Sequence, residues 1–386
     1  MWYNTKNKGG SGIMIDNRNK KLANNLIKNS ISLTEKDNLL IEVIGENGLE
    51  LGREIEKQAK KMNANPYIRV INYENLRNFL INSTNEEIIE YGKKEYELMK
   101  KMQAYIGISS PTSDKVLEDV SQEKLKVYNK YYTALVHLEQ RVKHTKWCIL
   151  RYPNEYLAKK SNMALNEFKN FYYDVCNVDY NKMKIAMEPL KKLMNKTDKV
   201  HIIAPGTDLE FSIKGISAEK YYGKFNIPDG EVATCPIKNS VNGYITYNTK
   251  TKYNDIIFEE VRFEFLDGKI INASAKEKTN ELNKILDTDE GARYIGEFAF
   301  GLNPYVNNVI CDTLFDEKIN GSFHLTPGMA LEESDNGNRS AIHWDIVKIL
   351  RKEFGGGQIY FDNKLIMKDG IFVLEELKPL NIENLK

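Results

Sequence analysis

Histidine, cysteine and long apolar runs are all scarce in this chain of 386 residues. The sequence has five histidines and four cysteines, and no two cysteines form the CxxC pair of a thiolate zinc site. The cysteines are scattered singly, which argues against a disulfide scaffold. No apolar run approaches the ~18–20 residues of a membrane span, and the N-terminus lacks the apolar core of a secretory signal. We therefore expect a cytoplasmic protein with no membrane segment.

An excess of charge of one sign is also missing. The chain has 55 Lys+Arg against 54 Asp+Glu, a formal net charge of +1. Nucleic acids and anionic membranes attract proteins with a basic excess, so we expect neither as a partner. Hydrophobic residues at 41% and charged residues at 28% are ordinary for a globular protein and exclude extensive disorder. Because single cores stop growing near ~250–300 residues, the length predicts two or three domains.

Residues 1–13 show no helical or strand pattern, and a second methionine, Met14, follows them. The codons for Lys8-Gly9-Gly10 can spell a bacterial ribosome-binding site at a suitable distance before Met14. We interpret residues 1–13 as a disordered or non-native extension and hypothesise that the natural start is Met14.

The pattern over residues 14–198 predicts an α/β domain, because short apolar runs alternate with longer helical stretches. Strands are expected at residues 39–44, 67–71, 105–108 and 147–150, and helices at 52–62, 86–102, 123–142, 166–175 and 182–194. Such strand–helix–strand units predict a mostly parallel sheet. The glycine-containing turn at residues 45–52 lacks GxGxxG and P-loop spacing, so we expect a strand-to-helix turn that binds no nucleotide.

The pattern changes after residue 198 to strand-like runs with turn residues between them. Asp267-Gly268 lies between two alternating runs and predicts a hairpin. We therefore expect a β-rich α+β domain over residues 199–386, with the boundary at residues 195–200. No flexible linker stands there, so the two domains should pack directly together.

The segment SAIHWDIV contains the most informative pair of polar residues. If the segment is a strand, His343 and Asp345 point to one face and Trp344 to the other. An imidazole and a carboxylate are costly to bury unless they pair with each other or bind a cation. At this point an ion pair and a cation site remain equal alternatives.

Three further polar residues stand in apolar surroundings and favour the cation site. They are Glu231 at a turn-to-strand junction, Glu297 inside an apolar run, and His324 after the acidic pair Asp316-Glu317. A set of Glu, Asp and His without Cys suits a hydrolytic zinc, cobalt or manganese site. Two metal ions fit five ligands if one carboxylate bridges them. No HExxH occurs, so a single-zinc protease of that type is excluded.

The other scarce residues are expected to have structural roles. His137 stands in a charged helix and is predicted to lie on the surface, whereas His144 and His201 are interpreted as structural residues. Cys148 and Cys176 are expected to be inert core thiols. Cys235, four residues after Glu231, is expected near the site but not as a ligand.

Five segments in this order, PDGEV, DEGARYIGE, TLFDE, FHLTPG and IHWD, resemble the thermophilic-metalloprotease-type aminopeptidases, a family with aminopeptidase T, aminopeptidase S and leucyl aminopeptidase relatives. The resemblance covers nearly the whole chain from about residue 20 and includes the segments LRYP, VDYNKM and APGTDLEF. It implies a peptide substrate and hydrolysis of the N-terminal peptide bond by a water activated between two divalent metal ions. It also implies a homodimer in which the first domain restricts access.

The same resemblance assigns roles to residues. It implies that the metal ligands are the five polar residues already singled out: Glu231, Glu297, His324, His343 and Asp345. Glu317 is the candidate general base, because an unligated carboxylate is needed near the water. Glu290 and Asp316 are alternatives for this role, and Arg293 is expected either to orient a carboxylate or to form a surface ion pair.

The chain departs from the family at two places. Leu331 stands where the family usually has a tyrosine close to the metals, and the spacing from Glu317 to His324 is longer than in the family's usual DEN segment. Two alternative functions therefore stay open. One is a dinuclear amidohydrolase or dipeptidase acting on another substrate, and the other is a catalytically weak metal- or peptide-binding protein.

Overall fold

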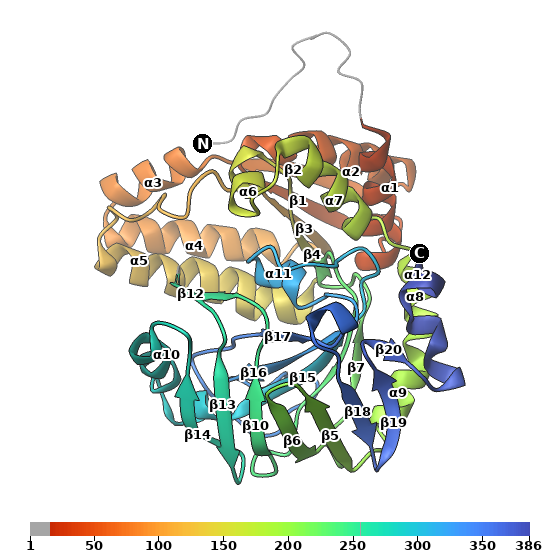
Figure 1. The fold of residues 1–386 in the computed structure, drawn as a ribbon. Helices are drawn as coiled ribbons and strands as arrows, with labels where there is room; N and C mark the ends of the chain where they lie inside the picture. The colour runs from red at the N-terminus through yellow and green to blue at the C-terminus, as the bar shows by residue number, and fades with distance from the viewer. Residues whose placement is uncertain (1–15, 255) are drawn as a thin grey trace.

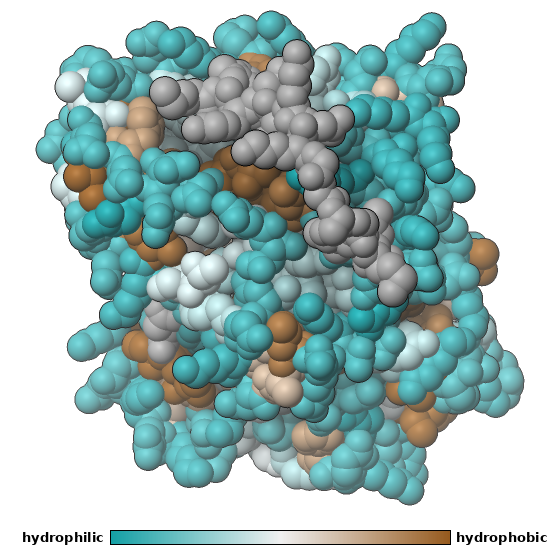
Figure 2. All heavy atoms as spheres, turned by 90° about the horizontal axis from the view of Figure 1, so that it is seen from above, coloured by the Kyte–Doolittle hydropathy of each residue, from teal (hydrophilic) through white to brown (hydrophobic). Residues whose placement is uncertain are grey.

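A computed structural model describes residues 16–254 and 256–386. The hypotheses about residues 1–13 and Met14 concern positions outside these ranges. The chain forms two parts, a helix-covered parallel sheet and a β-rich part with antiparallel sheets, stacked one on the other in Figure 1. No helix within the described ranges is long and apolar enough to cross a membrane. Seen from above, the surface is largely hydrophilic, with exposed hydrophobic side chains in separate groups (Figure 2).

The first part is built on a five-stranded sheet of order β2-β1-β3-β4-β8, in which every pairing is parallel. Its strands are β1 (Asn38–Ile44), β2 (Asn65–Ile71), β3 (Ala104–Ser109), β4 (Lys146–Arg151) and β8 (Asn226–Ile227). Apolar residues are buried on both faces, because α1 (Asn17–Asn25) and α2 (Leu49–Lys61) pack on one side and α4 (Asn85–Met99) and its neighbours on the other. Buried parallel strands of this kind read as apolar runs, as in Leu39–Ile41, and the one charged residue that follows, Glu42, is paired with Arg69.

The helices of this part begin where the sequence offers caps. Thr84 and Glu87 form a reciprocal capping box at the start of α4, and the Asn72 side chain accepts from two backbone amides of α3. The helices are α1 (Asn17–Asn25), α2 (Leu49–Lys61), α3 (Tyr73–Asn82), α4 (Asn85–Met99), α5 (Gln122–Tyr128), α6 (Glu155–Lys160), α7 (Leu165–Cys176), α8 (Tyr180–Ala186) and α9 (Glu188–Met194). A π-helical segment, η3 (Asn129–Val142), continues α5.

The second part contains an eight-stranded antiparallel sheet of order β14-β13-β10-β6-β5-β18-β19-β20 and a five-stranded antiparallel sheet of order β17-β16-β15-β9-β7. The strands are β5 (Lys199–Ala204), β6 (Thr207–Ser212), β7 (Glu219–Tyr221), β9 (Glu231–Thr234), β10 (Asn242–Thr246), β13 (Arg262–Leu266), β14 (Lys269–Ser274), β15 (Ile295–Gly301), β16 (Ser322–Pro327), β17 (Ile346–Ile349), β18 (Gln358–Phe361), β19 (Lys364–Lys368) and β20 (Ile371–Phe372). A separate hairpin joins β11 (Thr251–Tyr253) to β12 (Ile256–Phe258), and the helices are α10 (Thr279–Leu286), α11 (Thr313–Asp316) and α12 (Ile382–Leu385).

The five-stranded antiparallel sheet, β17-β16-β15-β9-β7, lies in the middle of the molecule (Figure 1). Every residue of β9, β15, β16 and β17 is buried, so both faces of these strands are covered. One face packs on the eight-stranded sheet through ring contacts such as Phe298 with Phe211 and Phe300 with Phe361. The other face carries the candidate site.

The predicted fold class is confirmed, with an α/β part on a parallel sheet followed by a β-rich part. The hairpin at Asp267-Gly268 is confirmed too, since both residues have positive φ between β13 and β14. The expected helix over residues 123–142 divides into α5 and η3, and the segment before Ile346 is irregular, with an isolated bridge at His343, instead of a continuous strand. The boundary at residues 195–200 stays a prediction, because β8 returns to the parallel sheet and one apolar core runs through both parts.

Candidate metal centre

Three adjacent strands of the five-stranded antiparallel sheet, β9, β15 and β16, carry polar side chains on the same face. Gly301 pairs with Glu231 of β9, and Ala299 pairs with His324 of β16. Glu297 lies two residues before Ala299 on β15, so all three polar side chains share a face. The small residues Ala299 and Gly301 between them leave room for these side chains to converge.

Two loop segments, one containing Ile319 and one containing Met329, lie close against the backbone of β15. A Cβ atom on Gly301 would lie 2.3 Å from the carbonyl oxygen of Ile319, so glycine allows the segment after α11 to cross the strand. A Cβ atom on Gly296 would lie 2.2 Å from the carbonyl oxygen of Met329, so the segment that contains Leu331 also lies against β15. Both glycines therefore bring loop residues over the polar face.

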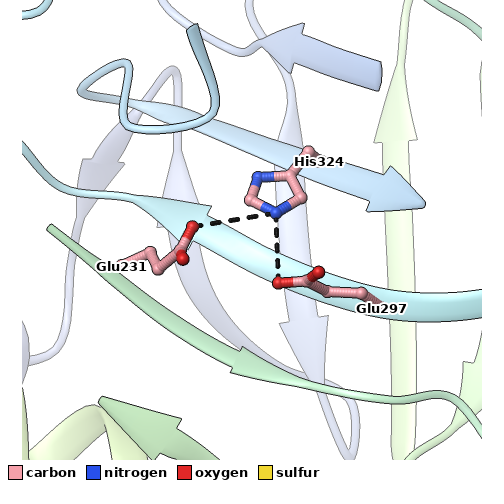
Figure 3. A group of neighbouring side chains, drawn as sticks. All are labelled: Glu231, Glu297 and His324. Carbon is pink, nitrogen blue, oxygen red and sulfur yellow. Dashed lines mark hydrogen bonds and ion pairs between the residues drawn. The ribbon is translucent and has the colours of Figure 1, made fainter. Parts of the chain in front are cut away.

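Glu231, Glu297 and His324 form the first cluster, called here the Glu231 group (Figure 3). His324 Nε2 lies 3.3 Å from Glu297 Oε1 and 3.8 Å from Glu231 Oε2, and all three residues are buried. Glu231 Oε2 and His324 Nδ1 are buried without a hydrogen-bond partner among the described residues. Burying an unpaired carboxylate oxygen is costly, so Glu231 Oε2, with Glu297 Oε1 and His324 Nε2 beside it, fits a bound cation.

Glu297, His343 and Asp345 form the second cluster, called here the Asp345 group. His343 Nε2 lies 3.2 Å from Glu297 Oε2 and 3.3 Å from Asp345 Oδ1. The Nδ1 of His343 lies 2.9 Å from the Met329 carbonyl, and donation to this oxygen leaves Nε2 free to bind a metal. Thr326 donates to Asp345 at 2.6 Å and orients that carboxylate. Glu297 therefore presents one oxygen to each group, as a bridging carboxylate would.

The neighbouring carboxylates favour the protonated form of both imidazoles, His324 and His343. Burial alone would lower the pKa of His324, but its hydrogen bond to Glu297 and the surrounding charges outweigh burial and raise the pKa to about 9. The charge of Asp345 likewise outweighs burial and raises the pKa of His343 to about 12. Burial would raise the pKa of Glu297, but hydrogen bonds from His324 and His343 hold it below its usual value. A divalent ion can take the place of these protons.

Lys318 is a residue of the site that sequence reasoning missed. Its side chain is 1% exposed, and Nζ lies 2.6 Å from Glu231, 2.7 Å from Glu317 and 3.6 Å from Asp229. Burial would lower the pKa of Lys318, but the charge of Glu231 and the other two carboxylates raises it well above its usual value. Lys318 directly follows Glu317 in a mixed segment, Lys318-Ile319-Asn320-Gly321-Ser322, so no local pattern distinguishes it.

A cavity of about 720 Å³ adjoins both groups. Glu231, Glu297, Glu317, His343 and Asp345 all line it. Further lining residues come from the end of η3 and from the parallel sheet: Val142, Lys143, Trp147, Phe225 and Asn226. The cavity thus lies between the two parts of the molecule, and a substrate must fit between them.

The structure separates the candidates for the general base. Glu317 lines the cavity, whereas the buried carboxylate of Asp316 accepts from the backbone amide of Ile310 at 2.8 Å. Glu290 is exposed on a short 3-10 helix. Arg293 pairs with Asp287 at 2.7 Å, which is the ion-pair alternative. Burial raises the pKa of Glu317 well above its usual value.

His137 is half-buried instead of lying freely on the surface. Its ring packs edge-on against Tyr105 and Tyr132, and its Nδ1 accepts from Arg141 Nε at 3.1 Å. Burial lowers the pKa of His137 to about 4. The charged neighbours in sequence misled the prediction, because Arg141 is itself buried over the rings of Tyr105 and Trp147.

Other single residues lie as expected. Cys148 and Cys176 are buried, and burial raises the pKa of both thiols. Cys235 is buried with its thiol 2.6 Å from the carbonyl oxygen of Gly296, next to Glu297 but outside both groups. His201 pairs with Asp208 at 2.8 Å on the eight-stranded sheet. Leu331 lines the cavity together with Glu297 and His343.

The sequence matches the family described as thermophilic metalloprotease (M29) over residues 15–372. It is 26% identical over 310 residues to aminopeptidase PepS of Streptococcus thermophilus, a match that covers 68% of this chain and 74% of that protein. It is 32% identical over 154 residues to aminopeptidase T of Thermus aquaticus, covering 36% of this chain and 37% of that protein.

Two solved structures share the fold. AmpT of Thermus thermophilus superposes with a TM-score of 0.72 and 21% identity over 93% of this chain and 99% of that chain. A 2,5-dihydroxypyridine dioxygenase of Pseudomonas putida KT2440 superposes with a TM-score of 0.60 and 13% identity over 93% of this chain and 98% of that chain. Because one fold holds differently named enzymes, the activity has to be argued from the side chains.

Proposed function

Because this chain belongs to the thermophilic metalloprotease family, M29, we propose that it is a metal-dependent aminopeptidase that releases the N-terminal residue of peptides with two divalent metal ions. The observation that carries the two-metal proposal is the position of Glu297. Its Oε1 faces His324 and its Oε2 faces His343, so one carboxylate serves both groups. The names of the curated relatives support peptide hydrolysis.

The proposed ligands of the first ion are Glu231, Glu297 and His324, and those of the second are Glu297, His343 and Asp345. Oxygen and imidazole ligands accept zinc, cobalt or manganese, and availability decides among them. When bound, such a pair of ions polarises the scissile carbonyl and lowers the pKa of the attacking water towards ~7. The remaining chemistry belongs to the side chains of the chain itself.

Glu317 is proposed as the general base. It lines the same cavity as both groups and belongs to neither of them. Burial favours its protonated form, and the ammonium of Lys318 at 2.7 Å opposes this effect by favouring the carboxylate. A carboxylate poised between these influences accepts a proton from the water and passes it to the leaving amine.

Selectivity for a free N-terminus is proposed to come from the acidic lining of the cavity. Glu332 and Glu333 line it and are not proposed to hold metal, whereas bound ions would balance the charges of Glu231, Glu297 and Asp345. The α-ammonium group of a peptide is attracted to such a cavity, whereas an acetylated N-terminus loses this attraction. The opposite wall, with Val142, Trp147 and Phe225, contacts the apolar parts of the substrate.

The test combines metal analysis with hydrolysis of a panel of aminoacyl-p-nitroanilides. About two ions per chain together with turnover of free but not N-acetylated substrates supports the proposal. Two ions with activity only on another amide supports a dinuclear amidohydrolase or dipeptidase. Bound metal without any turnover supports a metal- or peptide-binding protein, the alternative suggested by Leu331. A homodimer and a cytoplasmic location also remain predictions.

A further inference from the structure

Lys318 gives the two metal groups different electrostatic surroundings. Its ammonium lies 2.6 Å from Glu231 Oε1, and its side chain is almost fully buried. Within the described ranges, no lysine or arginine forms an ion pair with Glu297 or Asp345. One group therefore shares a ligand with a fixed positive charge, which Glu317 and Asp229 also contact, and the other has no such neighbour.

The ion pair also determines which oxygen of Glu231 is available. Oε1 is held by Lys318, and Oε2 faces His324 without a hydrogen bond. A metal ion on Oε2 and the ammonium on Oε1 would bind opposite oxygens of one carboxylate. Two cations on one carboxylate repel each other over a few ångströms, because little solvent separates them.

We propose that Lys318 makes the two metal positions unequal, so that the Asp345 group fills first and the Glu231 group holds a weaker, exchangeable second ion. This inference rests on the proposed function, in which both groups bind metal. The enzyme would then pass through a one-metal form whose conversion to the two-metal form depends on the free metal concentration. Lys318 would set the concentration at which this conversion occurs.

Lys318 has two opposing effects on the affinity of the Glu231 group for metal: it orients Glu231, and its charge repels the ion. Their magnitudes decide whether Lys318 strengthens or weakens metal binding. Orientation of a ligand by a neighbouring group is typically worth about 10–100-fold in metal affinity. Repulsion between an ammonium and a divalent ion about 5 Å apart, at an effective dielectric constant of about 20, corresponds to a loss of more than about 1,000-fold. Repulsion therefore exceeds orientation, and removal of the charge should strengthen binding of the second ion.

The experiment titrates the metal-free, full-length protein with cobalt chloride, and follows both the heat and the visible absorption of bound Co²⁺. We expect two binding steps in the wild type, separated by at least about tenfold in Kd. Lys318→Met should tighten the second step by about tenfold or more. Lys318→Arg, which keeps the charge, should preserve the separation. A second step that is unchanged or weaker in Lys318→Met would overturn the inference.

Two further variants keep the test decisive if Lys318→Met does not fold, which circular dichroism would reveal. Glu231→Gln should remove the weaker step and leave the tighter one, whereas Asp345→Asn should weaken the tighter one. The reverse assignment, or two equal steps in the wild type, contradicts the proposal. Failure to bind any Co²⁺ would instead contradict the proposed function, so the two failures can be distinguished.

Discussion

Replacement of Glu297 by glutamine tests the candidate site at the one residue that both groups share. Glu297→Gln keeps the size of the side chain but removes the charge and replaces one oxygen by an NH₂ group, which cannot bind a metal. In the structure the two oxygens face His324 Nε2 at 3.3 Å and His343 Nε2 at 3.2 Å. The substitution should therefore weaken metal binding at both positions.

The expected effect on stability follows from the linkage between binding and folding. A metal ion at 100 times its Kd stabilises the folded chain by about 2.7 kcal/mol, so two ions supply about 5 kcal/mol. An unfolding entropy of ~2.1 cal/mol/K per residue gives about 0.8 kcal/mol/K for 386 residues. Saturating metal should thus raise the Tm of the wild type by about 6–7 °C. If the variant binds each ion about 100-fold more weakly, the shift falls to about 1 °C.

The assay measures Tm by intrinsic fluorescence with and without metal, together with bound metal per chain and turnover of leucyl-p-nitroanilide. Glu264→Gln, on the eight-stranded sheet and paired with Arg262, is the matched control and should behave as the wild type. Retention of the metal-induced Tm shift, the metal content and the turnover in Glu297→Gln would refute the assignment of the site.

Four other predictions follow from the same structure. Glu317→Gln should lower kcat by about 10²–10⁴-fold with unchanged metal content. If the variant instead loses metal in proportion to its activity, Glu317 is not the base. Leu331→Tyr should raise kcat about tenfold by adding a hydroxyl donor beside the site, with Leu331→Phe as the control without the hydroxyl. Metal affinity should increase as pH rises from 6 to 9, because His324 and His343 have pKa values raised to about 9 and about 12 and must lose protons to bind. Calorimetry in buffers of different ionisation enthalpy should show the released protons. The pKa of His137 is lowered from 6.5 to about 4 in the folded chain. The unfolded chain therefore binds a proton first, and the free energy of unfolding, full above pH 6.5, falls by at most about 3 kcal/mol as pH drops towards 4. His137→Gln, followed by urea unfolding at pH 7 and pH 5, should reduce that acid sensitivity, and an unchanged pH dependence would contradict it.

The parts of the fold that the sequence predicts are those with strong local patterns. Residues 39–44 form a buried parallel strand, and such a strand favours a largely apolar run, here interrupted only by Glu42. The turn at Asp267-Gly268 needs positive φ, and these residue types adopt it readily. By contrast, β8 has only two residues, Asn226–Ile227, and owes its place to pairing with β4. No local pattern indicates such a strand.

The candidate site shows the same division between local pattern and tertiary contact. Glu297 and His324 stood out because a charged or polar residue inside an apolar run needs a partner when it is buried. Lys318 did not stand out, because its three carboxylate partners come from residues 229, 231 and 317, which meet only in the folded chain. The partial burial of His137 has no local signal for a related reason, since it depends on Arg141, which stacks over distant rings.

The placement of the site explains why the first part of the molecule should affect activity although it supplies no proposed ligand. All five proposed ligands come from the β-rich part, yet Val142, Lys143 and Trp147 line the same cavity. A cavity of about 720 Å³ bordered on this side by the first part admits a chain end more readily than the middle of a long peptide. Trp147→Ala should therefore change KM far more than metal affinity. Equal changes in both would mean that Trp147 acts on the metal groups instead of the substrate.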